Sequence, residues 1–504
     1  MSYILNTEGF LIPKKDISEK LLKLINNDLI ISPKINPQYD KKITFKIYRE
    51  NSKYYYTPKF WGLNKVCNKP KIRYTDVSKV DFQFNKTLRD HQKEITEKTI
   101  NQMMVKENGR VKKIGGAIIC ARTGIGKTIM ALYIANKLGF KTVIFTHTGN
   151  LANQWIDNIK DNYGSNINIG LIGGNKFNYN KFNPNDYDII VAMIQTVMKE
   201  KLDYSEYFED FGLSIYDETH HISSKEFNRV AQITNTRYTL GLTATLERSD
   251  KTDYLIPWFL GDISYKQEGL KGYAININIY RFNKEKDTRF REIKYNKNVC
   301  LPKMINNLIK IEERNNLIYN TAAKFLRENE HQVMVLISER LEHLFLLRKM
   351  FGDEFKVGYV IGESAIKKNS DIISEEEIKD LESKRIIFTI KGLVEGFDIK
   401  TIQSVFLTTP MSKILQACGR MLRMKPEEYV TNPTIFEIVD EFSLFPNMHI
   451  TRFKQYKSNY LTEEGSSVSY YNCNTNNNYN IELRKKVLIE KEEEYNDCAD
   501  FNFF

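Results

Sequence analysis

The stretch Ala121-Arg-Thr-Gly-Ile-Gly-Lys-Thr128 decides the fold of this chain. It follows residues 116–120, a short apolar run of strand type, and precedes residues 128–138, a helix-like stretch that Gly139 ends. Strand, glycine-containing loop and helix in this order predict a phosphate-binding loop, in which backbone N–H groups and a helix N-terminus face phosphate oxygens. Such loops belong to α/β domains.

Each part of this loop has an expected role. Lys127 is expected to reach the β- and γ-phosphates of ATP, and the Thr128 hydroxyl is expected to bind Mg²⁺. The remaining loop residues are expected to surround the phosphates: Ala121, Arg122, Thr123, Gly124, Ile125 and Gly126. Because Ala121 stands where the general pattern has Gly, the match is imperfect, and the alternative is a glycine-rich turn that caps a helix.

A second segment, Leu213-Ser-Ile-Tyr-Asp-Glu218, is an apolar strand that ends in two carboxylates. Hydrolysis of ATP needs both, since Asp217 would hold Mg²⁺ and Glu218 would orient and deprotonate the attacking water. The alternative is a solvated strand end. His220 and His221 suggest a metal pair, but adjacent residues point apart and no third ligand lies nearby, which argues against zinc.

A third segment is Gln416-Ala-Cys-Gly-Arg-Met-Leu-Arg423. Helical spacing places Gln416, Gly419, Arg420 and Arg423 on one face. Both guanidiniums could then reach one phosphate cluster, and an arginine supplied from a second domain raises the rate of phosphoryl transfer by about 10³ to 10⁵. A basic helix face is the alternative if the motif is considered alone.

Taken together, these segments resemble those of superfamily 2 helicases and translocases over about residues 85–442. Further motifs occur in the family's order: Leu88-Arg-Asp-His-Gln92, Phe145-Thr-His-Thr-Gly-Asn-Leu-Ala-Asn-Gln-Trp155, Ile194-Gln-Thr196, Gly241-Leu-Thr-Ala-Thr-Leu-Glu-Arg-Ser-Asp250, Val333-Met-Val-Leu-Ile-Ser338, and Thr389 with Glu395-Gly-Phe-Asp398. The resemblance implies that Gln92 contacts the adenine and that Gly396 and Asp398 lie at the nucleotide. It also implies that His220, Thr243 and Thr245 couple hydrolysis to strand movement. The nucleic-acid contacts that it implies are Thr146, Gln154, Gln195, Thr196 and Thr389.

Within this superfamily, three features resemble helicases of the xeroderma pigmentosum group B type and their relatives in large DNA viruses, including the poxvirus transcript-release helicase. They are the His-His after the acidic pair, the Asn-Gln-Trp ending at Trp155 and the Thr-Ala-Thr-Leu-x-Arg element. Arg248-Ser-Asp250 departs from the Arg-Glu-Asp element of the cellular proteins, so DNA opening by that element is not carried over. Thr57-Pro-Lys-Phe-Trp-Gly-Leu63 weakly resembles an element that precedes the motor in viral members.

Composition agrees with this class. The chain has 504 residues, and 74 Lys plus Arg against 63 Asp plus Glu give a formal charge of +11, which favours a polyanionic partner. Six scattered cysteines form no Cys-x-x-Cys pair, so neither a zinc site nor a disulfide framework is indicated. The N-terminus lacks a signal-peptide pattern and no apolar run is long enough to span a bilayer. An intracellular protein is expected.

The expected fold is α/β, with two tandem RecA-like parallel-sheet domains, a small N-terminal module and a short C-terminal tail. The expected boundaries are 1–84 for the module, 85–265 for the ATP-binding domain, 266–297 for an irregular connector, 298–445 for the second domain and 446–504 for the tail. Strands are expected near 142–145, 188–192, 213–216, 239–242, 385–390, 404–408 and 434–439, with an amphipathic helix at 340–350.

Several segments keep two interpretations. Tyr54-Tyr-Tyr56 could stack bases or pack within a strand. Asp440-Glu441 mimics an acidic ATPase pair but lacks an upstream phosphate loop, so it is interpreted as structural. The Asn-rich tract at 470–479 is expected to be a linker, and 481–497 a short helix with basic and acidic blocks.

The motifs predict a motor that binds ATP and Mg²⁺ between two domains and nucleic acid across both, as a monomer, with DNA favoured over RNA. Transcription machinery is an expected partner and no membrane is expected. The abundance of Asn, Lys, Ile and Tyr fits an AT-rich genome, so a large DNA virus is a reasonable source, with the host cytoplasm or virus factory, or the virion, as the location. An RNA helicase acting on viral transcripts is the alternative within the class. A nucleic-acid-binding scaffold with an inactive ATPase is the alternative from another class.

Overall fold

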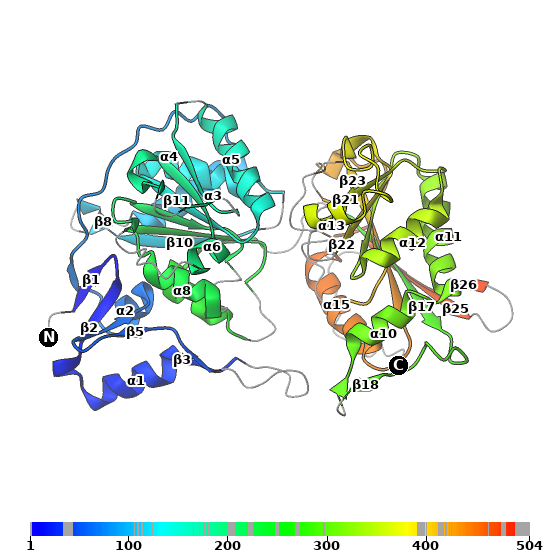
Figure 1. The fold of residues 1–504 in the computed structure, drawn as a ribbon, viewed down its shortest axis with the longest axis horizontal. Coiled ribbons are helices and arrows are strands. Elements are labelled where there is room, and N and C mark those ends of the chain that lie inside the picture. The colour runs from blue at the N-terminus through cyan, green and yellow to red at the C-terminus, as the bar shows by residue number, and fades with distance from the viewer. Residues whose placement is uncertain are drawn as a thin grey trace. The chain divides into compact units, whose positions relative to one another are not determined.

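The protein consists of two compact units, Met1–Gln267 and Glu268–Phe504, each with its own sheet and core (Figure 1). The computed structural model describes residues 3–33, 44–104, 106–107, 110–111, 114–121, 124–164, 166–174, 177–178, 181–199, 207–219, 225–246, 251–267, 273–295, 298–390, 399, 401–411, 418, 421–422, 424, 426–461, 463–474 and 480–488. Among these residues, no helix is both long and apolar enough to cross a bilayer.

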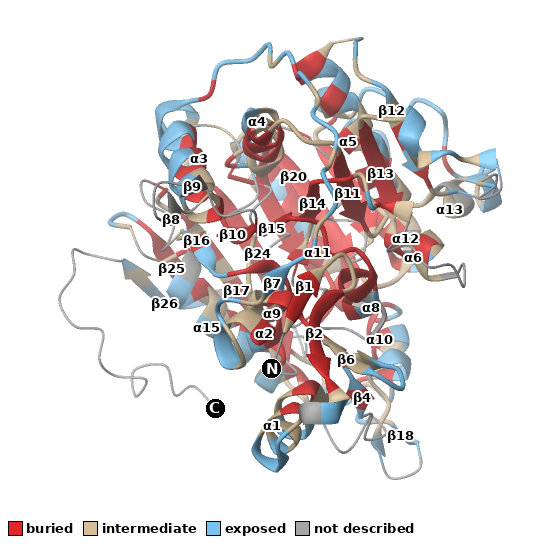
Figure 2. Ribbon diagram, turned by 90° about the vertical axis from the view of Figure 1, so that its left-hand side faces the viewer, coloured by how far each residue is buried: buried red, intermediate tan, exposed pale blue. Residues whose placement is uncertain are grey.

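The first unit contains a seven-stranded sheet in which every neighbouring pair is parallel. In spatial order its strands are β12 (Ile169–Ile172), β13 (Ile189–Met193), β11 (Thr142–Thr146), β14 (Leu213–Tyr216), β15 (Tyr238–Thr243), β10 (Gly115–Cys120) and β16 (Ile263–Lys266). Every residue of β10, β11, β14 and β15 is buried, which explains why these segments are apolar runs (Figure 2). The strands predicted in this unit are confirmed to within one residue.

Helices cover both faces of this sheet. One core joins the sheet to α3 (Asp90–Met103), α4 (Lys127–Leu138) and α5 (Gly149–Tyr163). The other core joins it to α6 (Ile194–Lys199), α8 (Lys225–Ile233) and α9 (Ile256–Leu260). Because Ala117 and Ile119 belong to the first core and Ile118 to the second, alternate residues of β10 serve opposite faces.

The N-terminal residues build a second, five-stranded sheet in the same unit. Its spatial order is β5 (Arg49–Glu50), β6 (Tyr54–Thr57), β2 (Gly9–Pro13), β1 (Ile4–Asn6) and β7 (Lys71–Ile72). Around it lie α1 (Glu19–Leu29), α2 (Lys59–Lys65) and the pair β3 (Ile30–Ile31) and β4 (Phe45–Lys46). Leu5, Phe10 and Trp61 share one core with the central sheet and α9, so this module packs as part of the first unit.

The aromatic cluster of this module lies on β6. Tyr55 packs against the shared core, whereas Tyr54 and Tyr56 contact each other with ring centroids 6.4 Å apart. All three side chains are half-buried. Packing therefore accounts for Tyr55, and base stacking by the other two stays a prediction.

The second unit contains an eight-stranded sheet that is parallel except at its last strand. In spatial order its strands are β21 (Val357–Val360), β22 (Ile386–Ile390), β20 (Val333–Ser338), β23 (Ile402–Leu407), β24 (Thr434–Asp440), β17 (Asn276–Asn283), β25 (Ser467–Asn474) and β26 (Asn480–Leu488). One face packs on α10 (Leu301–Leu308), α11 (Glu312–Glu328) and α12 (Leu341–Phe351), and the other on α15 (Phe445–Asn459). This unit also contains α13 (Glu363–Lys368) and the pair β18 (Lys294–Tyr295) with β19 (Asn298–Val299), whereas β8 (Lys106–Glu107) pairs with β9 (Arg110–Val111) in the first unit.

Two expectations for this unit require correction. Residues 276–283, expected within an irregular connector, form β17 between β24 and β25. The tract 470–479, expected as a linker, contributes residues 470–474 to β25, and the segment 481–497, expected as a short helix, contributes residues 481–488 to β26. The apolar residues of these segments alternate with Asn, Lys and Arg, and this polar content masked the period-two pattern of a strand. The rest of the Asn-rich tract lies outside the described residues.

Candidate nucleotide and nucleic-acid site

The predicted phosphate loop joins the end of β10 to the start of α4. Gly124 and Gly126 have φ angles of +88° and +98°, a region that glycine adopts without a steric penalty. A Cβ added to Gly126 would lie 2.4 Å from the Gln92 side-chain nitrogen, so this position also lacks space. Arg122 and Thr123 lie outside the described residues. The two described glycines thus have the backbone angles for which a phosphate-binding loop uses glycine.

Hydrogen bonds connect this loop to the neighbouring strand β15 and helix α3. Lys127 Nζ donates to the Ala121 carbonyl at 2.8 Å, and Thr128 is half-buried in the first turn of α4. The Ala121 N–H donates to the Thr243 carbonyl at 2.9 Å. Gln92 lies in α3 and donates to the Ile125 carbonyl at 2.9 Å. The predicted adenine-reading residue therefore also holds the phosphate loop.

The acidic pair follows the end of β14, two strands from β10. Asp217 accepts hydrogen bonds on both carboxylate oxygens, from the Trp155 indole at 2.9 Å and from the Glu218 N–H at 3.0 Å. Burial, followed by the charge of Glu218, raises the pKa of Asp217 to about 6, while Trp155 and Lys127 act in the opposite direction. Glu218 has φ +50°, a strained angle for a residue with a side chain.

The Thr-Ala-Thr element begins at the end of β15, between β14 and β10. Thr243 is fully buried, and its hydroxyl donates to the Thr245 carbonyl at 2.6 Å. The Thr245 N–H donates back to the Thr243 hydroxyl at 3.2 Å. This small turn stands beside the phosphate loop, because Thr243 pairs with Cys120 in the sheet. The phosphate loop, the acidic pair and this element therefore gather at the carboxyl ends of β10, β15 and β14.

The predicted nucleic-acid contacts occupy different environments. Thr146, at the end of β11, and Thr389, in β22, are fully buried, and the Thr389 hydroxyl donates to the Val360 carbonyl at 2.8 Å. Gln154 in α5 and Thr196 in α6 are half-buried, and Gln195 is exposed. Gln195, Gln154 and Thr196 are thus more accessible than the two buried threonines.

Several predicted site residues lie outside the described part of the chain: His220, Gly396, Asp398, Gln416, Arg420 and Arg423. Cys418, Met421 and Leu422 from the same motif are buried on the face of the second sheet that α15 covers. Within the described residues, no group of three or more His, Cys, Asp or Glu side chains is suited to hold a metal ion.

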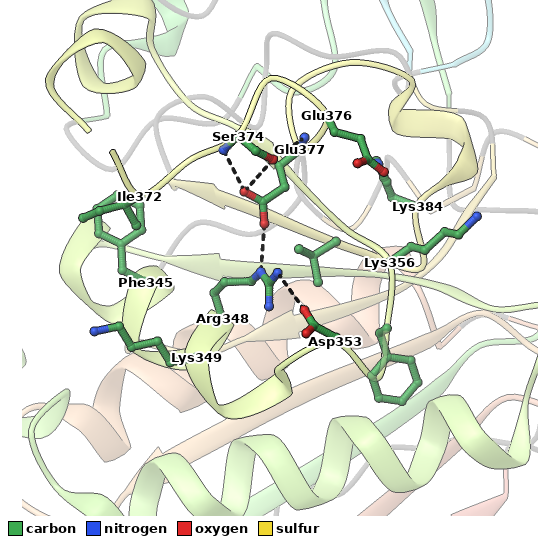
Figure 3. A pocket seen from close by; sticks show the side chains of 12 residues that line it. Phe345, Arg348, Lys349, Asp353, Lys356, Ile372, Ser374, Glu376, Glu377 and Lys384 are labelled. Carbon is green, nitrogen blue, oxygen red and sulfur yellow. Dashed lines mark hydrogen bonds and ion pairs between the residues drawn. The ribbon is translucent and has the colours of Figure 1, made fainter. Parts of the chain in front are cut away.

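The second unit also has a pocket of about 520 Å³ between α12 and the starts of β21 and β22 (Figure 3). Arg348 forms ion pairs with Glu377 at 2.8 Å and Asp353 at 3.7 Å, and Lys384 lies 3.6 Å from Glu376. The pocket is also lined by Lys349 and Lys356. It also lies at the opposite end of β22 from Thr389, and so is separate from the predicted site.

Sequence reasoning did not assign a role to Trp155 or Lys59. Trp155 was visible as the last residue of Asn-Gln-Trp, but its bond to Asp217 joins residues 62 positions apart. Lys59 is fully buried in α2 and donates to the carbonyls of Thr236 and Arg237, at 3.0 and 3.3 Å. The signal in the sequence for a buried lysine was its place directly before two aromatic residues, Phe60 and Trp61.

Known proteins match this chain over most of its length. A family model described as the type III restriction enzyme, res subunit, matches residues 85–248. A protein of Acanthamoeba polyphaga mimivirus, named as an ATP-dependent RNA helicase, is 30% identical over 96% of this chain and 90% of its own length. The chain belongs to the superfamily 2 helicases. This helicase is therefore an ATP-hydrolysing enzyme that acts on nucleic acid.

Further relatives also come from large DNA viruses. A helicase of Invertebrate iridescent virus 6 is 26% identical to this helicase over 71% of the chain and 80% of its own length.

Among solved structures, T4 UvsW covers 91% of the helicase with 19% identity and a TM-score of 0.36. The Pyrococcus furiosus Hef helicase domain covers 72% with 13% identity and a TM-score of 0.46.

Proposed function

We propose that this helicase uses Mg²⁺ and ATP to move along DNA. The observation that carries the proposal is the meeting of Lys127, Asp217, Glu218 and Thr243 at one edge of one parallel sheet. Two group B-like features belong to this site, because Thr243 is one of these residues and the Trp155 indole donates to Asp217, and they favour DNA over RNA as the track.

The chemistry of the loop fits a nucleoside triphosphate. Gly124 and Gly126 leave the loop amides uncovered, the α4 N-terminus carries a partial positive charge, and Lys127 adds a full one. Thr128 and Asp217 supply the hydroxyl and carboxylate oxygens that Mg²⁺ prefers, with waters and phosphates completing its shell. When bound, Mg²⁺ supplies charge neutralisation at the β- and γ-phosphates.

The protein's own residues divide the remaining work. Lys127 would exchange the Ala121 carbonyl for phosphate oxygens. Glu218 would accept the proton of the attacking water, while the bonds from the Trp155 indole and the Glu218 N–H orient the Asp217 carboxylate. Arg420 and Arg423 of the second unit would then neutralise charge on the transferring phosphoryl group, which makes hydrolysis depend on domain closure.

A second candidate is an ATP-dependent RNA helicase acting on viral transcripts, since the mimivirus relative carries that name. The two candidate functions share their catalytic residues. They differ in whether a DNA or an RNA strand, when bound, stimulates ATP hydrolysis. A role in viral transcription or genome maintenance fits both.

The test that separates the two candidates measures how strongly each nucleic acid stimulates ATP hydrolysis, and not how tightly it binds. Backbone contacts dominate motor binding, so affinity for either polymer should fall with salt at a log-log slope of about 0.7 per neutralised phosphate on single strands. At matched saturation, DNA should stimulate ATP hydrolysis more than RNA of the same sequence. Stronger stimulation by RNA would move the assignment to the second candidate.

A further inference from the structure

The indole of Trp155 forms a direct link between helix α5 and the acidic pair. Its Nε1–H donates to Asp217 Oδ2 at 2.9 Å, and its side chain is 2% exposed. The other carboxylate oxygen accepts the Glu218 N–H. The direction of the Asp217 carboxylate is therefore set by one side chain from outside its own strand and by one adjacent amide.

Helix α5 connects a predicted nucleic-acid contact to Trp155. It runs without interruption from Gly149 to Tyr163, and its N-terminus is capped by the Thr148 hydroxyl, which accepts the Leu151 N–H at 3.3 Å. Gln154, a predicted nucleic-acid contact, directly precedes Trp155. A displacement of α5 at Gln154 would therefore reach the indole within the same turn of helix.

We propose that Trp155 is a positioning residue that transmits nucleic-acid binding at α5 to the orientation of Asp217, through the indole–carboxylate hydrogen bond. The inference rests on the proposed function, because it takes Asp217 as the Mg²⁺ ligand and α5 as part of the nucleic-acid interface. Trp155 would thus be a further residue, outside the Thr-Ala-Thr element, that couples nucleic-acid binding to ATP hydrolysis.

A packing role for Trp155 is the competing explanation, since its ring also belongs to a hydrophobic core with Ile144 and Ile159. The chain provides a matched control. Trp61 is fully buried, and its indole donates to Asp28 Oδ2 at the same distance of 2.9 Å, within the N-terminal module. Trp61→Phe thus removes the same kind of bond from the same kind of environment, away from the site.

The first experiment compares full-length Trp155→Phe and Trp61→Phe with the wild type. A hydrogen bond to a charged group is worth roughly a tenfold change or more in an equilibrium. Trp155→Phe should therefore lose about tenfold in the ratio of nucleic-acid-stimulated to basal ATPase rate, and should require about tenfold more Mg²⁺ to half-saturate binding of a fluorescent ATP analogue. KM for ATP should change less than kcat. Trp61→Phe should match the wild type in all of these values.

Equal stimulation ratios and Mg²⁺ requirements in the two variants would overturn the inference and leave Trp155 as a packing residue. A wild type whose ATPase is not stimulated by DNA or RNA would instead contradict the proposed function. The two failures are therefore distinguishable.

A second measurement does not depend on a Trp155 variant. The chain has three tryptophans, so 5-fluorotryptophan labelling gives three ¹⁹F resonances, and Trp61→Phe and Trp258→Phe assign the third to Trp155. That resonance should shift when Mg²⁺ and ADP are added, and shift again with single-stranded DNA. A Trp155 resonance that nucleic acid leaves unmoved would refute the link.

Discussion

At the scale of single residues, chemistry and backbone strain coincide in the acidic pair. Glu218, the residue proposed to activate the attacking water, adopts φ +50°. Such angles cost about 1–3 kcal/mol and persist where the surroundings determine them, here the end of β14 and the Asp217 carboxylate that accepts the Glu218 N–H. The identity of this residue was predictable from Asp-Glu after an apolar strand. Its conformation was not, because no local sequence pattern requires a positive φ there.

Lys127→Ala should abolish ATP hydrolysis while the protein stays folded. The Lys127 ammonium donates to the Ala121 carbonyl, and the positive φ angles of the loop are those of Gly124 and Gly126, which the substitution leaves in place. Circular dichroism and a steady-state ATPase assay check this prediction. Near-normal turnover in a folded Lys127→Ala protein would remove the phosphate-loop assignment.

Glu218→Gln should behave differently from Lys127→Ala. The amide cannot accept the proton of water, but Asp217 keeps its position as a metal ligand. The variant should bind a fluorescent ATP analogue within about threefold of the wild type and lose turnover by about 10² or more. Loss of nucleotide binding would count against Glu218 as the general base.

At the scale of elements, the sequence predicted five strands of the first parallel sheet, β10, β11, β13, β14 and β15, and three of the second, β22, β23 and β24. These are buried parallel strands, which are continuous apolar runs. No strand was predicted for β12, β16, β20 and β21, and the interpretation of the segments that form β17, β25 and β26 was wrong. Their apolar residues alternate with Asn, Lys and Arg, so composition pointed away from a strand. The sequence also did not predict contacts between residues far apart in the chain. The bond between Lys59 and the start of β15 connects segments about 180 residues apart, and nothing local encodes it.

Lys59 makes the stability of the first unit depend on pH. Burial lowers the pKa of its ammonium from 10.5 to about 7, so between those values the unfolded chain binds more protons than the folded one. The free energy of unfolding should therefore rise with pH from about 7 to 9, by roughly 1–3 kcal/mol. Lys59→Met should flatten this rise. Urea unfolding at pH 6, 7, 8 and 9 measures it, and equal slopes for both proteins would contradict the prediction.

Asp440 and Glu441 end β24, and the structure confirms their structural interpretation. Asp440 is fully buried and holds the equally buried Arg314 through two bonds, at 2.8 and 3.0 Å, while Arg314 also donates to the Thr408 carbonyl. Asp440→Asn should destabilise the second unit by about 3–5 kcal/mol, because it leaves a buried guanidinium without its counter-charge. Glu441→Gln is the control. Its partially exposed ion pair with Arg281 should contribute about 0–1 kcal/mol, so comparable losses in the two variants would be unexpected.

At the scale of the whole molecule, the proposed mechanism of ATP hydrolysis uses groups from both compact units. The first unit holds the phosphate loop and the acidic pair, and the second holds Arg420 and Arg423. The sequence order of these motifs predicted this division, because arginines about 300 residues beyond the loop belong to another sheet. Neither arginine lies in the described part of the chain, so their role rests on the resemblance and on chemistry.

Arg420→Ala and Arg423→Ala should each lower nucleic-acid-stimulated ATPase by about 10³ or more, the range seen for arginine fingers. Nucleotide affinity should change far less, because the loop and the acidic pair that bind ATP remain intact in the first unit. Fluorescent-nucleotide titration and stimulated ATPase rates on the same samples separate the two effects. A chain that ends at Gln267, the boundary of the first unit, provides the decisive comparison. It should bind nucleotide but show no stimulation, and full stimulated activity in that protein would show that one unit suffices.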